Sequence, residues 1–172
     1  MSVRLAVLTR GLSVGALFFV ALAAPGCGPD SVVETASVPQ ENDFSAVSEA
    51  LEVRCGSLDC HGMAERNLRL YGQYGLRLSD SDIPGGNETT PDEHHENYLT
   101  LITLEPEALA SVAQGAAASH LTLVRKARGV EDHKGGSPFP KGSAGDRCLV
   151  SWLAGQVDQA SCTEASKLLE PP

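Results

Sequence analysis

The chain has 172 residues, which is enough for one domain of ordinary size. Its formal net charge is −9, and phosphates would be repelled by so acidic a protein, which argues against a nucleic-acid partner. Aromatic residues make up only 5% of the chain, so the side chains offer little large apolar surface for a core.

Residues 1–26 are typical of a signal peptide. Arg4 and Arg10 give a positive front, and an uncharged apolar run follows from Leu12 to Ala24. Small residues stand directly before Cys27, as in a lipoprotein-type signal in which the cysteine receives the lipid. We therefore expect an exported protein on the periplasmic or outer-membrane side, bound to a membrane through lipid on Cys27. An ordinary cleaved secretory signal is the alternative.

Behind the signal, the composition divides the chain into three parts. Residues 27–42 are polar and contain Gly and Pro, as expected of a flexible, disordered tether. Residues 43–162 carry the apolar periodicity of a folded domain, and residues 163–172 form a tail with at most a weak helix. Within the domain, Asp43 is a predicted N-cap for an amphipathic helix over Phe44–Arg54.

A cysteine-cysteine-histidine motif follows that helix directly. Cys55 and Cys60 are separated by four residues, and His61 comes immediately after the second cysteine. Covalent haem attachment uses this chemistry, because two thiols add across the haem vinyl groups and the neighbouring imidazole ligates the iron. The usual motif has two residues between the cysteines. A haem would also supply the large apolar surface that the side chains lack.

Two other interpretations of the motif remain open. A local disulfide between Cys55 and Cys60 fits an exported, oxidising compartment. A zinc site would use both cysteines and His61, with a fourth ligand from one of the remaining histidines. The candidates for that ligand are His94, His95 and His133.

Residues between the motif and residue 97 are predicted to be extended or loop. Leucines alternate with Arg69 and Arg77, and these two guanidinium groups are candidates for pairing with haem propionates. Residues 79–97 are predicted to be a polar, acidic loop. Apolar periodicity and capping residues then predict four further helical segments. These segments are Tyr98–Leu104, Pro106–Gln114, His120–Arg128 and Gly145–Ala154.

A second iron ligand has one leading candidate. Met1 is lost with the signal, and Met63 is too close to His61 along the chain to reach the opposite haem face. His133 stands in a Gly-rich loop, where it can approach a ligand closely. The distal ligand is therefore predicted to be His133, or else the iron keeps an open position. The remaining cysteines, Cys148 and Cys162, are expected to form a disulfide.

Over roughly residues 44–158, the chain resembles a divergent cytochrome c domain of exported bacterial proteins. The resemblance rests on the first helix, the motif at Cys55, Cys60 and His61, a Gly-rich loop, and a helix ending in Trp-Leu-Ala-Gly at Gly155. It implies a mainly α fold, a small cytochrome c-like helical bundle with long loops. It also implies haem c attached at the two cysteines, with His61 as the proximal iron ligand.

These features together predict a lipid-anchored monohaem c-type cytochrome that carries electrons outside the cytoplasm. Such a protein needs a redox partner and a membrane but no nucleic acid, and it is not an enzyme. The alternative is a haem-free lipoprotein, stapled by disulfides at Cys55–Cys60 and Cys148–Cys162, that serves as a surface interaction module.

Overall fold

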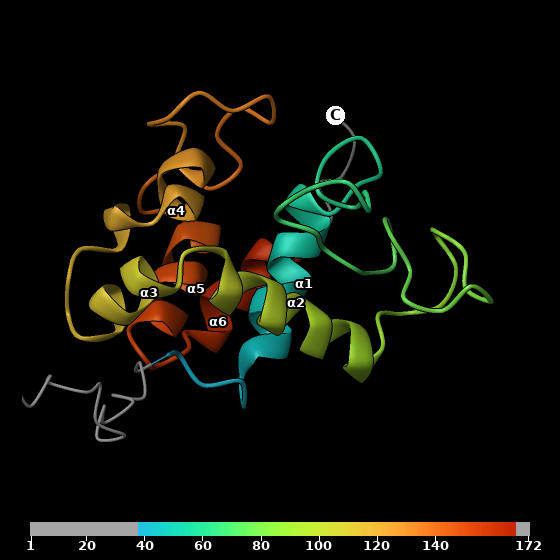
Figure 1. The fold of residues 1–172 in the computed structure, drawn as a ribbon, viewed down its shortest axis with the longest axis horizontal. Helices are drawn as coiled ribbons and strands as arrows, with labels where there is room; N and C mark the ends of the chain where they lie inside the picture. The colour runs from blue at the N-terminus through green and yellow to red at the C-terminus, as the bar shows by residue number, and fades with distance from the viewer. Residues whose placement is uncertain (1–37, 168–172) are drawn as a thin grey trace, which may run out of the picture. The chain divides into compact units, whose positions relative to one another are not determined.

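Helices and long loops make up the fold from residue 38 to residue 167, the part of the chain that this computed structural model describes (Figure 1). The helical segments are α1 (Phe44–Cys55), α2 (Pro91–Leu104), α3 (Pro106–Ala113), the 3₁₀ turn η1 (Ala118–His120), α4 (Thr122–Ala127), α5 (Ala144–Leu153) and α6 (Gln159–Ala165). The predicted mainly α class is confirmed. The predicted signal, Cys27 and most of the tether lie outside the described residues. Within residues 38–167, no helix combines the length and apolarity needed to cross a membrane.

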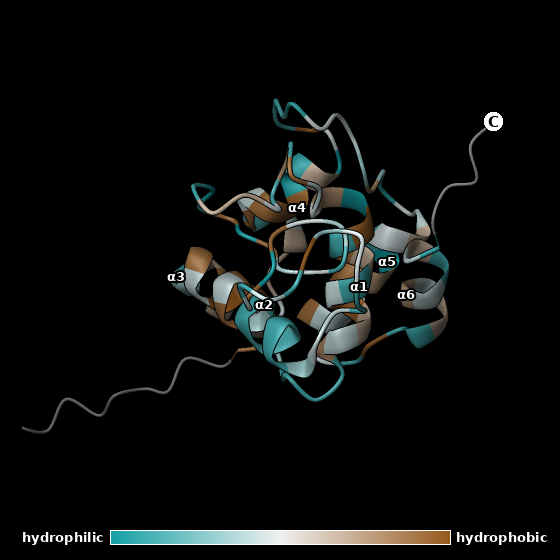
Figure 2. Cartoon of the chain, turned by 90° about the vertical axis from the view of Figure 1, so that its right-hand side faces the viewer, coloured by the Kyte–Doolittle hydropathy of each residue, from teal (hydrophilic) through white to brown (hydrophobic). Residues whose placement is uncertain are grey.

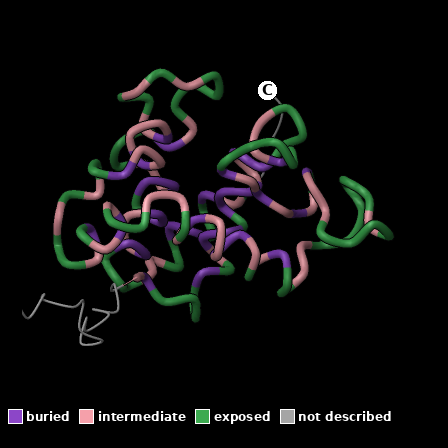
Figure 3. The backbone as a smooth tube through the Cα atoms, viewed as in Figure 1, coloured by how far each residue is buried: buried purple, intermediate pink, exposed green. Residues whose placement is uncertain are grey.

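The first helix lies at the centre of the helical packing, since α1 contacts α2, α5 and α6. Phe44, Val47 and Leu51 recur at helical spacing along α1, and each is 1% exposed. Phe44 packs against Trp152 of α5 with ring centres 4.9 Å apart, and against Tyr98 of α2 at 5.5 Å. Buried segments gather on these helices, and the long loops are mostly exposed (Figure 3).

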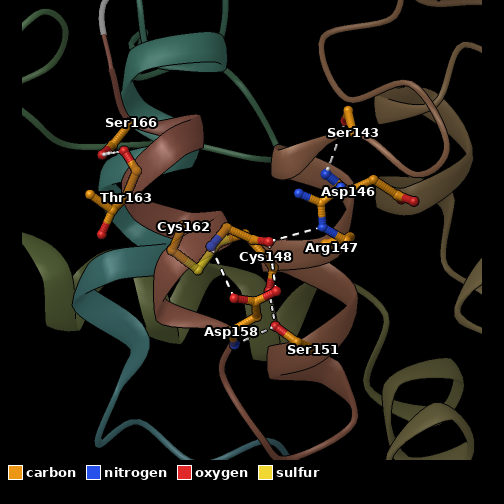
Figure 4. Close-up of a disulfide and its surroundings, with 10 residues drawn as sticks. Ser143, Asp146, Arg147, Cys148, Ser151, Asp158, Cys162, Thr163 and Ser166 are labelled. Carbon is orange, nitrogen blue, oxygen red and sulfur yellow. Dashed lines mark hydrogen bonds between the residues drawn. A yellow bond between two sulfur atoms is a disulfide. The ribbon is translucent and has the colours of Figure 1, made fainter.

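The predicted disulfide is confirmed. Cys148 of α5 is joined to Cys162 of α6, and both residues are buried (Figure 4). No helix is predicted between Gly155 and Cys162, yet α6 begins at Gln159. Asp158 is its N-cap, and its carboxylate accepts a hydrogen bond from the backbone N–H of Ser161 at 3.0 Å.

The second helix begins earlier than predicted, and its first turns are hydrophilic (Figure 2). Residues 79–97 are therefore not all loop, because α2 starts at Pro91. Thr90 and Glu93 form a capping box, in which the Thr90 hydroxyl accepts from the Glu93 N–H and the Glu93 carboxylate accepts from the Thr90 N–H. The segment was predicted as loop because it is polar, although it contains the capping residues that begin a helix.

Two further boundaries differ from the predictions. The segment predicted as one helix over His120–Arg128 is a 3₁₀ turn followed by the shorter α4, with a break at Leu121. The extended segments expected near Leu68 and Leu76 contain, among the described residues, a single isolated bridge between Tyr71 and Leu76. Leu68 and Leu70 are buried in the core from this irregular backbone, whereas Leu78 is 44% exposed.

Candidate functional site

His61 is held in place by three hydrogen bonds from its immediate surroundings. Its backbone N–H donates to the carbonyl of Cys55 at 2.8 Å, and its own carbonyl accepts from the N–H of Leu70 at 2.8 Å. Its ring Nδ1 lies 2.8 Å from the carbonyl oxygen of Leu68. A carbonyl can only accept, so Nδ1 carries the proton and donates. The other ring nitrogen, Nε2, is then left with its lone pair.

The charge state of His61 matches that arrangement. Burial lowers the pKa of His61 below its ordinary value, more than the hydrogen bond to Leu68 raises it. The imidazole is therefore neutral at physiological pH. A neutral imidazole with one nitrogen fixed by a backbone carbonyl is the form that ligates metals.

Glycine is required next to His61 because two backbone segments nearly touch there. A Cβ on Gly62 would lie 2.0 Å from the carbonyl oxygen of Gly56, and a Cβ on Gly75 would lie 1.9 Å from the same atom. Neither distance is sterically tolerable for a side chain. This close packing fixes the loop between Cys55 and His61 against the segment around Gly75.

The ring of His133 lies beside the ring of His61. The two rings have their centres 5.8 Å apart, and their planes differ by only 18°. The Nδ1 of His133 lies 3.4 Å from the carbonyl oxygen of Gly136, a long contact. The structure therefore brings together His61 and His133, the two histidines that the sequence predicts as ligands on opposite faces of one haem.

A cavity of about 460 Å³ opens beside the two histidines. Cys55 lies in its wall with both His61 and His133. Its other lining residues come mainly from the segment after His61 and from α4, and half of them are apolar. They are Leu51, Glu65, Arg66, Asn67, Leu68, Leu104, Glu105, Thr122, Leu123, Lys126, Ala127 and Pro138.

A second hollow of about 210 Å³ shares several walls with the first. It is lined by both histidines, Arg66 and Lys126, and also by Cys60. The two cysteines of the motif thus line neighbouring hollows that meet at the histidine pair.

The two motif cysteines are free thiols, so the structure contains no bridge between Cys55 and Cys60. Cys55 is buried, and burial raises the pKa of its thiol to about 12, with a smaller contribution from the nearby Cys60. Cys55 is therefore neutral at physiological pH. A neutral thiol is a poor nucleophile and a poor zinc ligand, but a thioether made from it would also be neutral and would suit a buried position.

The two arginines proposed for propionate contacts lie elsewhere. Arg77 forms a bidentate ion pair with Glu93, in which Nε and Nη2 donate to the two carboxylate oxygens at 2.8 and 3.0 Å. The two side chains are 3% and 1% exposed. Arg69 donates to the carbonyl of Ala64 and lies 5.7 Å from the centre of the Tyr71 ring. Neither arginine lines the cavity. Arg77 is a structural residue that ties the loop to α2.

The cations that do line both hollows are Arg66 and Lys126. Arg66 donates from Nε to the carbonyl of Cys60 at 3.1 Å, which ties it to the motif loop. Its only signal in the sequence was its place five residues after His61.

The remaining histidines of the zinc interpretation do not join the site. His94 and His95 are on α2, where their Nδ1 atoms lie 3.4 Å from Glu52 and 2.7 Å from Glu41. In the described part of the chain, no three His, Cys, Asp or Glu side chains are grouped so that they could hold a metal ion.

Comparisons with known proteins add no relative. The chain matches no protein-family model, no curated protein and no solved structure.

Proposed function

We propose that this protein is a monohaem c-type cytochrome that is exported, lipid-anchored at Cys27, and carries electrons outside the cytoplasm. The observation that carries the proposal is the His61 ring, with Nδ1 fixed by the Leu68 carbonyl, in the wall of a 460 Å³ cavity that also contains Cys55 and His133. When bound, haem supplies one-electron redox chemistry at an iron whose potential depends on its axial ligands.

The cavity suits a large, flat, mainly apolar group. Its volume lies in the range of about 300–1,000 Å³ usual for cofactor and ligand sites. Four leucines, from α1, the segment after His61, α2 and α4, supply apolar walls, and Arg66 and Lys126 supply positive charge for carboxylates. In a chain with few aromatic residues, a haem would complete the core on this side.

The histidine pair has a spacing that suits axial ligation. Because nitrogen–metal bonds are about 2 Å long, one metal ion held by a nitrogen of each ring would place the ring centres roughly 6 Å apart. The ring centres of His61 and His133 are 5.8 Å apart. His61 is the proximal ligand in this proposal and His133 the distal one. A pair of imidazoles favours a lower reduction potential than a histidine–methionine pair.

Covalent attachment is the decisive test of the proposal. The full-length chain is produced with its signal in a bacterium that makes c-type cytochromes, and the purified protein is denatured and reduced. We expect the absorbance of covalently bound haem. It should be lost in the double variant Cys55→Ser, Cys60→Ser and retained in the control Cys148→Ser, Cys162→Ser.

Peptide mass mapping without reduction separates this function from the alternative. In the cytochrome, the peptide that contains Cys55 and Cys60 carries the mass of haem. If the two cysteines are instead joined to each other and no haem mass is found, the cytochrome proposal is overturned. The protein is then the disulfide-stapled interaction module.

A further inference from the structure

The loop that carries His133 has few contacts with the rest of the protein. It leaves α4 after Ala127 and returns at Phe139, where the Phe139 N–H donates to the Ala127 carbonyl at 2.8 Å. Between these two ends, none of residues 128–138 is buried, and Val130 is 76% exposed. Apolar packing therefore does not fix the position of His133.

Polar contacts hold the loop instead. The N–H groups of Val130 and Glu131 donate to the Arg125 carbonyl at 3.0 and 3.4 Å, and Arg128 pairs with Asp146 of α5 at 2.7 Å. One carboxylate oxygen of Glu131 lies 2.9 Å from Nε of Arg125, and the other lies 3.1 Å from Nζ of Lys126. Lys126 also donates to the carbonyl of Asp132 at 3.0 Å. Both cations are on α4, so these contacts fix the backbone directly before His133 to a helix that lines the cavity.

The two histidines are thus held very differently. His61 has two backbone hydrogen bonds and a short side-chain hydrogen bond in a tightly packed segment. The His133 side chain has one long contact, to the Gly136 carbonyl. Of the two rings, the one at His133 moves more easily, and the ion pairs at Glu131 oppose that movement.

We propose that Glu131 is a positioning residue that holds His133 at the distal face, and that loosening its ion pairs opens this face to a small external ligand. The inference rests on the proposed haem site, with His133 as the distal ligand. Glu131 itself does not touch the site; it acts through the loop. The ligand is a neutral nitrogen donor or a diatomic molecule, the class that binds an open axial position.

The expected effect follows from the strength of exposed ion pairs. All three side chains are between one-third and two-fifths exposed, so the pairs are modest and sensitive to salt. Losing both pairs should raise the population with His133 displaced about three- to ten-fold. The apparent dissociation constant of an external ligand falls by the same factor.

The experiment compares the haem-loaded wild type with the variants Glu131→Gln and Glu131→Asp. Imidazole is titrated against the ferric protein, and absorption and electron paramagnetic resonance record the spin state. We expect a low-spin wild type, about three- to ten-fold tighter imidazole binding in Glu131→Gln, and an intermediate value in Glu131→Asp. The matched control is Glu164→Gln, which breaks the exposed ion pair between Glu164 of α6 and Lys167 beyond its end, and which should bind imidazole like the wild type.

Other outcomes overturn the inference in distinguishable ways. Equal imidazole affinity in wild type and Glu131→Gln shows that the ion pairs do not position His133. A high-spin wild type shows that His133 is not a ligand, while the covalent haem of the proposed function still stands. Absence of covalent haem removes the proposed function and this inference with it.

Discussion

At the scale of single residues, Glu93 and Arg77 form a buried ion pair in which Glu93 also caps α2. Burial alone would raise the pKa of Glu93, but hydrogen bonds from Arg77 and from the N–H groups of Thr90 and Leu78 outweigh it and hold the pKa at about 2. The same carboxylate caps α2 and anchors the guanidinium of the preceding loop. This pair fixes the loop around Arg77 to α2, which is part of the helical core.

The ion pair gives stability a defined dependence on pH. The ordinary pKa of a glutamate is 4.5 and the folded value for Glu93 is about 2, so its contribution is complete above about pH 5 and is lost as the pH falls towards 2. We expect Glu93→Gln to lower the free energy of unfolding at pH 7 by about 3 kcal/mol. Urea unfolding at pH 7 and pH 3 measures this, and the difference between the proteins should shrink at pH 3.

The exposed Glu88 provides the control for that experiment, since its side chain has no ion pair among the described residues. Glu88→Gln should change the unfolding free energy by less than about 0.5 kcal/mol at either pH. If Glu93→Gln lowers the free energy of unfolding by the same amount at pH 7 and at pH 3, the pH dependence does not come from this pair.

At the scale of secondary-structure elements, α5 and α6 depend on their covalent link. The cap at Asp158 and the disulfide Cys148–Cys162 together hold the short α6 against α5 (Figure 4). A helix of seven residues has little stability of its own, so it requires such contacts.

Removing that disulfide should weaken the fold without affecting the proposed cofactor site. The bridged cysteines are 14 residues apart, and closing a loop of this size stabilises a protein by about 3 kcal/mol. We expect the variant Cys148→Ala, Cys162→Ala to lose about that much in denaturant unfolding monitored by circular dichroism. An unchanged midpoint would mean that the two helices pack equally well without the link.

At the scale of the whole folded unit, the aromatic cluster joins three helices. Trp152 of α5 packs against Phe44 of α1 and lies near Tyr98 of α2, and its indole N–H donates to the Gln40 carbonyl at 2.9 Å. The cluster lies away from the cavity and holds the scaffold that positions Cys55. The single tryptophan is thus a core residue of the scaffold.

Truncating the tryptophan should therefore affect the entire unit. Trp152→Ala should lower the free energy of unfolding by about 3–5 kcal/mol, and Trp152→Phe, which keeps most of the apolar contact, by about 1–2 kcal/mol. Differential scanning calorimetry measures the loss, with the exposed Val130→Ala as control. Equal losses for Ala and Phe would show that the hydrogen bond to Gln40, and not packing, is the main contribution.

The amino-acid sequence by itself determined the local features whose signals are local. Apolar spacing and capping residues predicted α1, α3 and α5 to within one residue of their observed bounds. Elimination among five cysteines predicted the Cys148–Cys162 bridge. The sequence did not predict the first turns of α2 after Thr90 or the helix α6 after Asp158, because their capping residues were not recognised.

The tertiary structure alone decided how distant segments meet. Nothing local to Arg77 says that Glu93 is its partner, so a cation predicted for the cofactor is instead part of the scaffold. In the same way, the cavity walls come from segments up to 87 residues apart along the chain, from Leu51 to Pro138. The sequence named Cys55, His61 and His133 by their chemistry, but only packing in three dimensions brings them to one cavity, because their contacts depend on how α1 and α4 are arranged.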